Sequence, residues 1–174
     1  MARPGAAPAR RRVVVTGGSG GIGRALLAAF AGEGHEVVAM ARDPEALRAA
    51  VATVGASSGG EVVPVPCDVA DEEAVAAAFA GFSRVDVLVT GAGVAEAAPL
   101  ARTTLAAWRH HLDANATGTF LCARAVLPGM AEAGWGRIVA VASTAARVGS
   151  RYTAAYTASK HAALGLVRAV AAEV

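Results

Sequence analysis

The chain has 174 residues, of which 55% are hydrophobic and 17% charged, a composition that favours one folded domain and excludes extended disorder. The net charge of +2 excludes a nucleic-acid-binding footprint. The sequence contains no uninterrupted apolar run of about 18 residues, so it predicts no membrane-spanning helix. Cys67 and Cys122 stand far apart with no CxxC or Cys/His cluster, so we expect no disulfide framework, no metal site and a reducing cytoplasm.

Residues 1–11 form a basic segment rich in Pro, Gly and Ala, and four of the arginines lie within the first 12 residues. The segment resembles the start of a signal peptide, but no long apolar stretch follows it. We therefore expect residues 1–11 to be a flexible tail and residues 12–174 to form the folded domain.

Short Val-rich runs alternate with Ala-rich stretches from residue 12 onward. The runs are continuously apolar, which is typical of parallel strands that are buried on both faces. The five predicted strands are Val13–Thr16, Glu36–Met40, Glu61–Pro66, Val85–Thr90 and Arg137–Ala142.

The Ala-rich stretches have the length of helices, and their ends carry capping residues. Asp43 precedes a Pro at the first helical position and Asp71 precedes two glutamates, both of which indicate a helix start. Gly34 is a candidate for closing the first helix, and Pro128 is expected to kink or interrupt the fourth. The five predicted helices are Ile22–Glu33, Pro44–Val54, Glu72–Ala80, Thr104–Ala133 and a last one from Thr153 onward.

Repeated β–α units predict an α/β fold, a doubly wound parallel sheet of Rossmann type with helices on both faces. The last helix runs to Val174 without a stop signal, and the strand at 137–142 would be left as a long apolar edge. We therefore expect a Rossmann domain that is incomplete at its C-terminus. The alternative is a natural short form that pairs this edge in an oligomer.

A glycine-rich string follows the first predicted strand and leads directly into the first helix. Glycines allow positive φ and let the backbone approach a pyrophosphate, while the free N–H groups of the helix start bind phosphate. A tight surface turn is the alternative, but the position between strand and helix favours a nucleotide site. The candidate cofactor-binding residues of the string are Gly17, Gly18, Ser19, Gly20, Gly21, Ile22 and Gly23.

The end of the second strand bears on which cofactor is used. An NAD site usually has a carboxylate there for the ribose 2′-hydroxyl, whereas this chain has Ala41 followed by Arg42. Arg42 could pair with a 2′-phosphate, which favours NADP(H), with NAD(H) or a merely solvated Arg as the alternatives. Asp68 and Val69 follow the third strand, where the carboxylate could accept from the adenine amino group or simply lead into the next helix.

Tyr156 and Lys160 begin the last predicted helix, and their i, i+4 spacing puts the phenol and the ammonium on one face. A neighbouring cation stabilises a phenolate, so Tyr156 is a candidate general acid/base for a carbonyl/alcohol pair. Lys160 is also the single Lys beside 15 Arg, and an ammonium differs from a guanidinium in shape and hydration.

Two further polar residues could serve the same reaction. Ser143 ends the fifth strand, 13 residues before Tyr156, where its hydroxyl could polarise the substrate carbonyl. Asn115 lies inside a predicted helix, although Asn is a poor helix former that favours polar partners. Taken singly, these residues also fit an ordinary half-buried Tyr, a loop Ser and an Asn on a helix surface.

The glycine string, Asn115, Ser143 and the pair Tyr156-xxx-Lys160, in this order, resemble the short-chain dehydrogenase/reductase family over nearly all of the chain from about residue 12. The resemblance implies that Tyr156 donates or accepts the proton. It implies that Lys160 holds the nicotinamide ribose hydroxyls and favours the phenolate. It further implies that Ser143 orients the substrate and that Asn115 supports a water relay to Lys160.

The chain departs from the family pattern in two places. The family usually has Asn-Asn-Ala-Gly after the fourth strand, where this chain has Thr-Gly-Ala-Gly at 90–93. We expect the turn to survive with Thr90 and Ala92 beside the cofactor, and the bonds of the missing Asn side chain to be lost or replaced by Thr90. Many NADP-using members also carry a basic residue where this chain has Gly20, so the NADP(H) preference depends on Arg42 alone.

Two other kinds of site are not predicted. No Lys-Ser/Thr follows the glycine string, which excludes a P-loop. His110 and His111 are adjacent, so they face different sides of a helix, and no third ligand is near. We expect this His pair to lie on a polar helix surface and to bind no metal.

These observations predict an NADP(H)-dependent oxidoreductase that transfers a hydride between nicotinamide and a small carbonyl or secondary alcohol. By resemblance the substrate is a 3-oxoacyl thioester, and the full-length protein is a homodimer or homotetramer assembled through the helices at 104–133 and from 153 onward. Family members usually have about 250 residues, so most of the substrate pocket would lie beyond this chain. The alternatives are a non-catalytic nucleotide-binding module and an inactive fragment.

Overall fold

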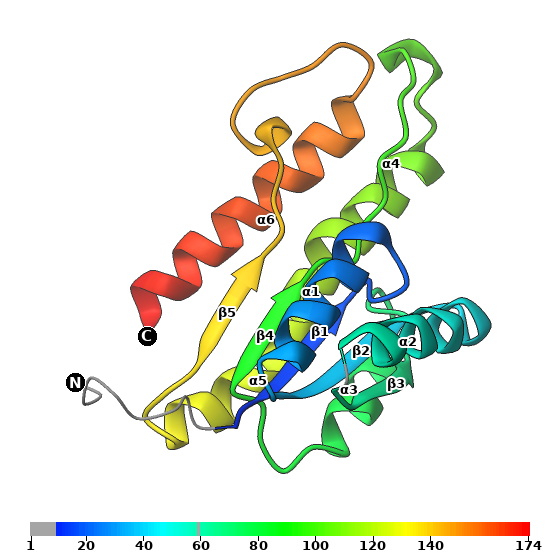
Figure 1. Cartoon of the computed structure of the whole chain (residues 1–174). Coiled ribbons are helices and arrows are strands. Elements are labelled where there is room, and N and C mark those ends of the chain that lie inside the picture. The colour runs from blue at the N-terminus through cyan, green and yellow to red at the C-terminus, as the bar shows by residue number, and fades with distance from the viewer. Residues whose placement is uncertain (1–9, 59) are drawn as a thin grey trace.

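A single parallel sheet of five strands organises the computed structural model, which describes residues 10–58 and 60–174. The strand order is β3-β2-β1-β4-β5, so the direction of winding reverses between β1 and β4 (Figure 1). Of the predicted tail at residues 1–11, residues 1–9 lie outside the described residues. The strands are β1 (Arg12–Thr16), β2 (Glu36–Ala41), β3 (Val62–Pro66), β4 (Val87–Thr90) and β5 (Arg137–Ala140).

Helices cover both faces of this sheet, and each face has its own apolar core. Val13 and Val15 of β1 pack into the core beneath α1 and α2, whereas Val14, which points the opposite way, packs into the core beneath α3 and α5. This is the two-sided burial of a doubly wound sheet. The helices are α1 (Gly21–Gly32), α2 (Pro44–Ser58), α3 (Glu72–Ala80), α4 (Leu105–Leu112), α5 (Gly118–Glu132) and α6 (Ala154–Glu173).

The predicted burial of every strand on both faces is wrong for the two edge strands. All residues of β4 and nearly all of β1 and β2 are buried. In β3 only Val62 is buried and three of the five residues are exposed, and β5 alternates between exposed and partly buried positions. Val63 and Val139 are 39% and 43% exposed. An edge strand has only one neighbouring strand and incomplete helical cover, so its apolar sequence alone does not bury it.

The predicted caps are confirmed, whereas Pro128 does not interrupt its helix. Asp71 accepts hydrogen bonds from two amides at the start of α3, Asp43 does the same for α2, and Gly34 closes α1 with φ of 81°. Pro128 lies inside α5, which continues to Glu132. The long predicted helix contains a π-helical turn at Asp113–Thr117, which joins α4 to α5 with helical backbone throughout.

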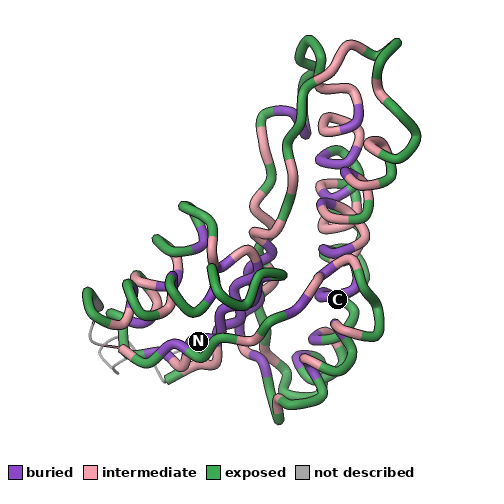
Figure 2. The backbone as a smooth tube through the Cα atoms, turned by 90° about the vertical axis from the view of Figure 1, so that its right-hand side faces the viewer, coloured by how far each residue is buried: buried purple, intermediate pink, exposed green. Residues whose placement is uncertain are grey.

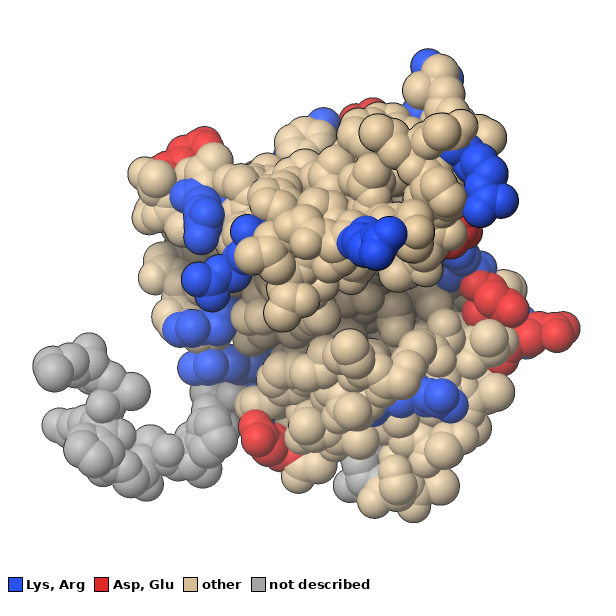
Figure 3. Space-filling model, turned by 90° about the horizontal axis from the view of Figure 1, so that it is seen from above, with Lys and Arg blue, Asp and Glu red and all other residues tan. Residues whose placement is uncertain are grey.

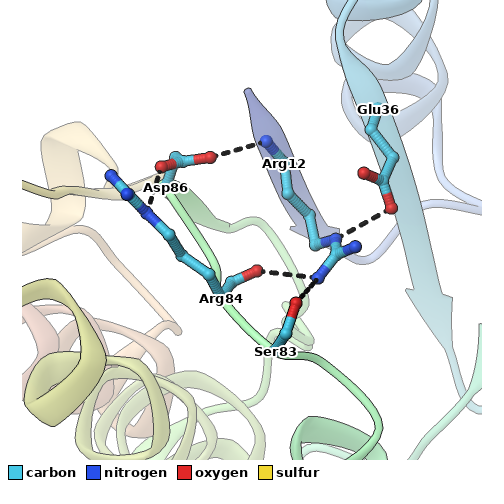
Figure 4. Close-up of polar contacts among 5 residues, drawn as sticks. All are labelled: Arg12, Glu36, Ser83, Arg84 and Asp86. Atoms are coloured by element: carbon cyan, nitrogen blue, oxygen red, sulfur yellow. Dashed lines mark hydrogen bonds and ion pairs between the residues drawn. The ribbon is translucent and has the colours of Figure 1, made fainter. Parts of the chain in front are cut away.

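A network of charged and polar groups ties the strands together at their amino ends (Figure 4). The Arg12 guanidinium donates to the Glu36 carboxylate (2.8 Å), the Ser83 hydroxyl (3.2 Å) and the Arg84 carbonyl (3.1 Å). The Asp86 carboxylate accepts from the Arg12 backbone N–H (2.8 Å) and pairs with Arg84 (2.7 Å). The network therefore joins β1 to β2 and to the loop before β4.

Burial is highest in the central strands of the sheet and in α5, and in α6 it is confined to the first half (Figure 2). The buried residues of α6 are Ala155, Ser159, Lys160 and Ala163, and the rest of the helix is more exposed. An apolar cavity of about 470 Å³ lies between α5, β5 and α6, with Trp135 and Val174 in its lining. No helix in the described part of the chain combines the length and apolarity needed to cross a membrane.

Candidate nucleotide-binding and active site

The winding reversal between β1 and β4 opens a cavity of about 300 Å³ at the carboxyl ends of the strands. Such a switch point is where open α/β sheets bind ligands. Seen from above, the molecular surface is hollowed near its centre, with basic side chains on several sides (Figure 3). The predicted cofactor residues that line the cavity are Gly17, Ser19, Gly20, Arg42, Asp68, Val69 and Ala92. The others do not line it, namely Gly18, Gly21, Ile22, Gly23, Thr90, Tyr156 and Lys160.

The glycine string packs its backbone against the neighbouring turn and the start of α1. Gly17 has φ of 74°, and a Cβ there would lie 2.7 Å from the Gly91 carbonyl oxygen. A Cβ on Gly23 would overlap the Gly17 carbonyl. Gly20 provides the N-cap of α1 without a side-chain bond to the first-turn amides. The loop thus presents backbone and the positive end of a helix to the cavity, which suits a pyrophosphate.

Thr16, which no sequence pattern singled out as a structural anchor, holds the turn after β4. Its buried hydroxyl accepts from the backbone N–H groups of Gly91 and Ala92, both at 3.1 Å. Thr90, by contrast, has a buried hydroxyl oxygen without a hydrogen-bond partner among the described residues. Of the two alternatives for the bonds of the family's Asn, the structure therefore agrees with their loss and not with their replacement by Thr90, and Thr16 steadies the turn from the adjacent strand.

Two charged residues line the cavity at the far side of the glycine string. Arg42 is exposed and forms no ion pair within residues 10–58 and 60–174, so its guanidinium is available to an anion. Asp68 accepts from the backbone N–H of Ala70 at 3.0 Å, which leaves its second oxygen for another donor. Cys67 lies beside them, and burial together with the charge of Asp68 raises the pKa of its thiol.

Asn115 sits in the π-helical turn, where it is 1% exposed and all its polar atoms are used. Its side-chain oxygen accepts from the N–H of Val94, and its amide nitrogen donates to the carbonyl of Val94, both at 2.9 Å. The same nitrogen donates to the Ser159 hydroxyl at 2.8 Å. Asn115 therefore joins the turn, the loop after β4 and α6, and π-helical turns of this kind are frequent at functional sites.

Tyr156 and Lys160 lie in the first turns of α6, above the carboxyl end of the sheet. The Lys160 ammonium is buried, donates to the Val141 carbonyl at 3.0 Å and lies 5.9 Å from the centre of the Tyr156 ring. Burial lowers the pKa of Lys160. Tyr156 itself is half-buried, so its ring is supported while part of it faces the solvent.

Ser143 begins the short turn Thr144–Ala146, which packs against α6. Its hydroxyl oxygen accepts from the N–H of Ala145 at 3.1 Å, and the side chain is half-buried. No hydrogen bond joins Ser143 to Tyr156 within the described ranges. The structure thus brings the segment of Ser143 to the helix of Tyr156 and leaves the Ser143 proton available to another acceptor.

His111 was expected on a polar helix surface, and that expectation is wrong. The His111 side chain is 2% exposed, accepts from the Glu96 N–H at 3.0 Å and approaches the Tyr156 ring to 6.4 Å between centroids. The one sequence signal that pointed to this burial is its spacing of four residues from Asn115, which puts both side chains on one helix face. Among the described residues no cluster of three potential metal ligands occurs.

Comparisons with known proteins agree with this geometry. The family model described as short chain dehydrogenase matches residues 11–174. A D-threitol dehydrogenase from Mycolicibacterium smegmatis is 41% identical over 92% of the chain and 63% of the relative. A 3-oxoacyl-[acyl-carrier-protein] reductase from Synechocystis is 37% identical over 92% of the chain and 67% of the relative.

A solved structure of a metagenomic short-chain oxidoreductase in complex with NADP superposes with a TM-score of 0.90 at 36% identity. The match covers 97% of this chain and 78% of that one. The chain spans about two thirds of the length of the two enzymes above, at 63% and 67%.

Proposed function

Because this chain belongs to the short-chain dehydrogenase family, we propose that it is part of an NADP(H)-dependent oxidoreductase acting on a carbonyl or secondary alcohol. The observation that carries the proposal is the buried Lys160 ammonium beside the half-buried ring of Tyr156, at the same sheet edge as the glycine-lined cavity. A pure nucleotide binder has no use for a phenol and an ammonium placed together in this way.

The residues present fit a dinucleotide. The cavity offers backbone and the uncapped start of α1 for a pyrophosphate, an exposed Arg42 for a 2′-phosphate and Asp68 for an adenine amino group. An Ala at position 41 removes the acid that would repel a 2′-phosphate. These features favour NADP(H) over NAD(H), and the bound nicotinamide would supply or accept the hydride.

The chain's own residues would manage the proton and the oxygen. In the reductive direction Tyr156 gives its hydroxyl proton to the substrate oxygen as that oxygen gains charge, and the Ser143 hydroxyl donates a hydrogen bond to the same oxygen. Lys160 stabilises the resulting phenolate and holds the ribose hydroxyls. Asn115 keeps the turn and α6 in register through Val94 and Ser159.

Two substrate classes are supported by the relatives. A 3-oxoacyl thioester is our first choice, because the Synechocystis relative is named as a reductase of such a substrate. A polyol is the second, because the Mycolicibacterium relative is named as a D-threitol dehydrogenase. Consumption of NADPH with an acetoacetyl thioester, or formation of NADPH from NADP⁺ with D-threitol, separates them.

The first prediction concerns Tyr156. We expect Tyr156→Phe to lower turnover at least a hundredfold, since a general acid contributes about 10²–10⁴-fold, and to leave NADPH affinity within about twofold because the ring is retained. NADPH fluorescence titration and steady-state assays measure the two quantities. Equal turnover by the variant would refute the mechanism. Binding without turnover by the unmodified chain favours a nucleotide-binding module, and no binding favours an inactive fragment.

We also propose a reducing, cytoplasmic setting and self-assembly. Cys67 and Cys122 are both free and buried, as expected of a protein that does not depend on disulfides. Exposed apolar side chains on the helices, such as Phe120 of α5, support assembly into a homodimer or homotetramer. Sedimentation velocity measures the oligomeric state directly.

A further inference from the structure

The loop between β4 and α4 has no regular secondary structure over residues 94–98, and its backbone is hydrogen-bonded at both ends. At one end the Asn115 side chain accepts a hydrogen bond from the Val94 N–H and donates one to the Val94 carbonyl. At the other end the N–H of Ala98 donates to the carbonyl of Tyr152 at 2.7 Å. Tyr152 has a positive φ of 65°, so the β5–α6 loop adopts an unfavourable backbone conformation where it meets this segment.

The middle of this segment is held by one side chain, His111. The His111 Nε2 atom accepts from the Glu96 N–H at 3.0 Å, and Nδ1 lies 2.8 Å from the carbonyl oxygen of Ala107. A carbonyl can only accept, so Nδ1 carries the proton and Nε2 is the acceptor, which is the neutral imidazole. Both nitrogens bond to backbone, so His111 has no free nitrogen with which to bind a metal or abstract a proton.

The same imidazole reaches the proposed acid/base. Its ring meets the Tyr156 ring at 72° with centroids 6.4 Å apart, an edge-to-face contact. His111 is therefore in contact both with the residue proposed to transfer the proton and with the loop that faces it. Because the His111 side chain is only 2% exposed, its ring and its hydrogen bonds are shielded from water.

We propose that His111 is a positioning residue that fixes segment 94–98 as one wall of the substrate site beside Tyr156. The segment begins at Val94, which lines the nucleotide cavity, and at Ala98 it is bonded to Tyr152 in the loop that separates Ser143 from Tyr156. The segment thus extends from the nucleotide cavity toward the proposed reacting groups of Tyr156 and Ser143. The role of this segment as a substrate wall rests on the function proposed above. The anchoring of the Glu96 N–H by His111 does not depend on that function.

Two variants separate the acceptor from the ring. His111→Phe keeps an aromatic ring against Tyr156 but removes the acceptor for the Glu96 N–H. His111→Gln removes the ring but can present an amide oxygen where Nε2 stood. If His111 anchors the segment, the two variants differ in the exchange rate of the Glu96 amide and not merely in overall stability.

Amide hydrogen exchange on the ¹⁵N-labelled full chain is the first measurement. We expect the Glu96 amide to exchange about tenfold faster in His111→Phe, as the loss of one hydrogen bond predicts, and to recover at least partly in His111→Gln. The Val94 amide, held by Asn115, is the internal control, so a change in overall stability moves both amides alike. An unchanged ratio of the Glu96 and Val94 rates in His111→Phe overturns the proposal, and so does a His111→Gln rate equal to that of His111→Phe.

Steady-state kinetics with NADPH and an acetoacetyl thioester test the substrate wall. We expect His111→Phe to raise KM for the thioester about fivefold or more while the NADPH Kd and kcat change less, because the reacting groups remain. An unchanged KM overturns the wall and leaves only the anchor. If the unmodified chain neither binds NADPH nor turns over, the proposed function and the wall both fail, whereas the exchange result still decides the anchor.

Discussion

Lys160 shows at the scale of one residue why this chain keeps a single lysine among its arginines. Its ammonium is buried and has one acceptor among the described residues, the Val141 carbonyl. An ammonium has three donors, so two remain for groups outside the chain, such as ribose hydroxyls. A guanidinium is larger, planar and forked, so it would place its donors differently beside Gly93 and the Val141 carbonyl.

Arg42 carries the proposed cofactor preference, so reversing its charge tests it. We expect Arg42→Asp to weaken NADPH binding roughly ten- to hundredfold, as the loss of charge-assisted hydrogen bonds predicts, and to affect NADH much less. Arg48→Asp is the matched control, because Arg48 is an exposed residue of α2 outside the cavity lining. Fluorescence titrations with both cofactors give the ratio, and an NADPH/NADH ratio equal to that of the control would remove Arg42 from the site.

The burial of the Cys122 thiol leads us to expect a loss of folding stability at alkaline pH. Burial raises the pKa of the Cys122 thiol to about 12 from its ordinary value of 9.0, so the unfolded chain loses this proton at a lower pH than the folded chain. The associated stability is complete below about pH 9 and falls as pH rises toward 12. Urea unfolding between pH 8 and 10.5 should show a steeper decline for the unmodified chain than for Cys122→Ala, and parallel curves would contradict this explanation.

At the scale of elements, the local parts of the fold were predictable and the non-local parts were not. The caps at Asp43 and Asp71 and the closure by Gly34 depend on neighbouring residues, and all three are confirmed. The π-helical turn between α4 and α5 contains Asn115, whose partners lie 21 and 44 residues away. A helix, meanwhile, tolerates Pro128 when the surrounding packing outweighs the lost hydrogen bond.

The candidate site divides in the same way. The glycine string and the pair Tyr156 and Lys160 are defined by spacing along the chain, so the sequence alone was sufficient to propose them as site residues. His111 has no such pattern, because its function depends on the loop that folds back over α4 to reach it. Thr16 likewise acts on the turn after β4 only once the two strands are paired.

The Asp71 cap allows the stability of one element to be measured. Its carboxylate accepts from the N–H groups of Glu73 and Ala74, so Asp71→Ala should lower the free energy of unfolding by about 1 kcal/mol. Asp71→Asn, which retains a capping oxygen, should lose much less. Equilibrium urea unfolding measures both variants, and equal losses would mean that the charge at the helix start matters more than the hydrogen bonds.

At the scale of the whole molecule, the two ends of the sheet have different tasks. The carboxyl ends carry the glycine string, the cavity and the start of α6, and they combine glycine backbone with a few charged and polar side chains such as Arg42 and Lys160. The amino ends carry the Arg12 network, which joins β1, β2 and the loop before β4 (Figure 4). The hydrogen-bonded strands between the two ends keep them apart, so a defect in the network should affect stability without affecting ligand affinity.

Two substitutions in the network test this separation. Asp86 accepts the Arg12 backbone N–H and pairs with Arg84, and its side chain is 14% exposed, so Asp86→Ala should lower the free energy of unfolding by about 1–3 kcal/mol. Glu36 is 38% exposed, and water screens its pair with Arg12, so Glu36→Gln should cost at most about 1 kcal/mol and less at high salt. Urea unfolding at low and high salt measures both losses. NADPH titration of both variants should give the affinity of the unmodified chain, and a changed Kd in Asp86→Ala would mean that the amino ends of the strands do control the site at the opposite edge.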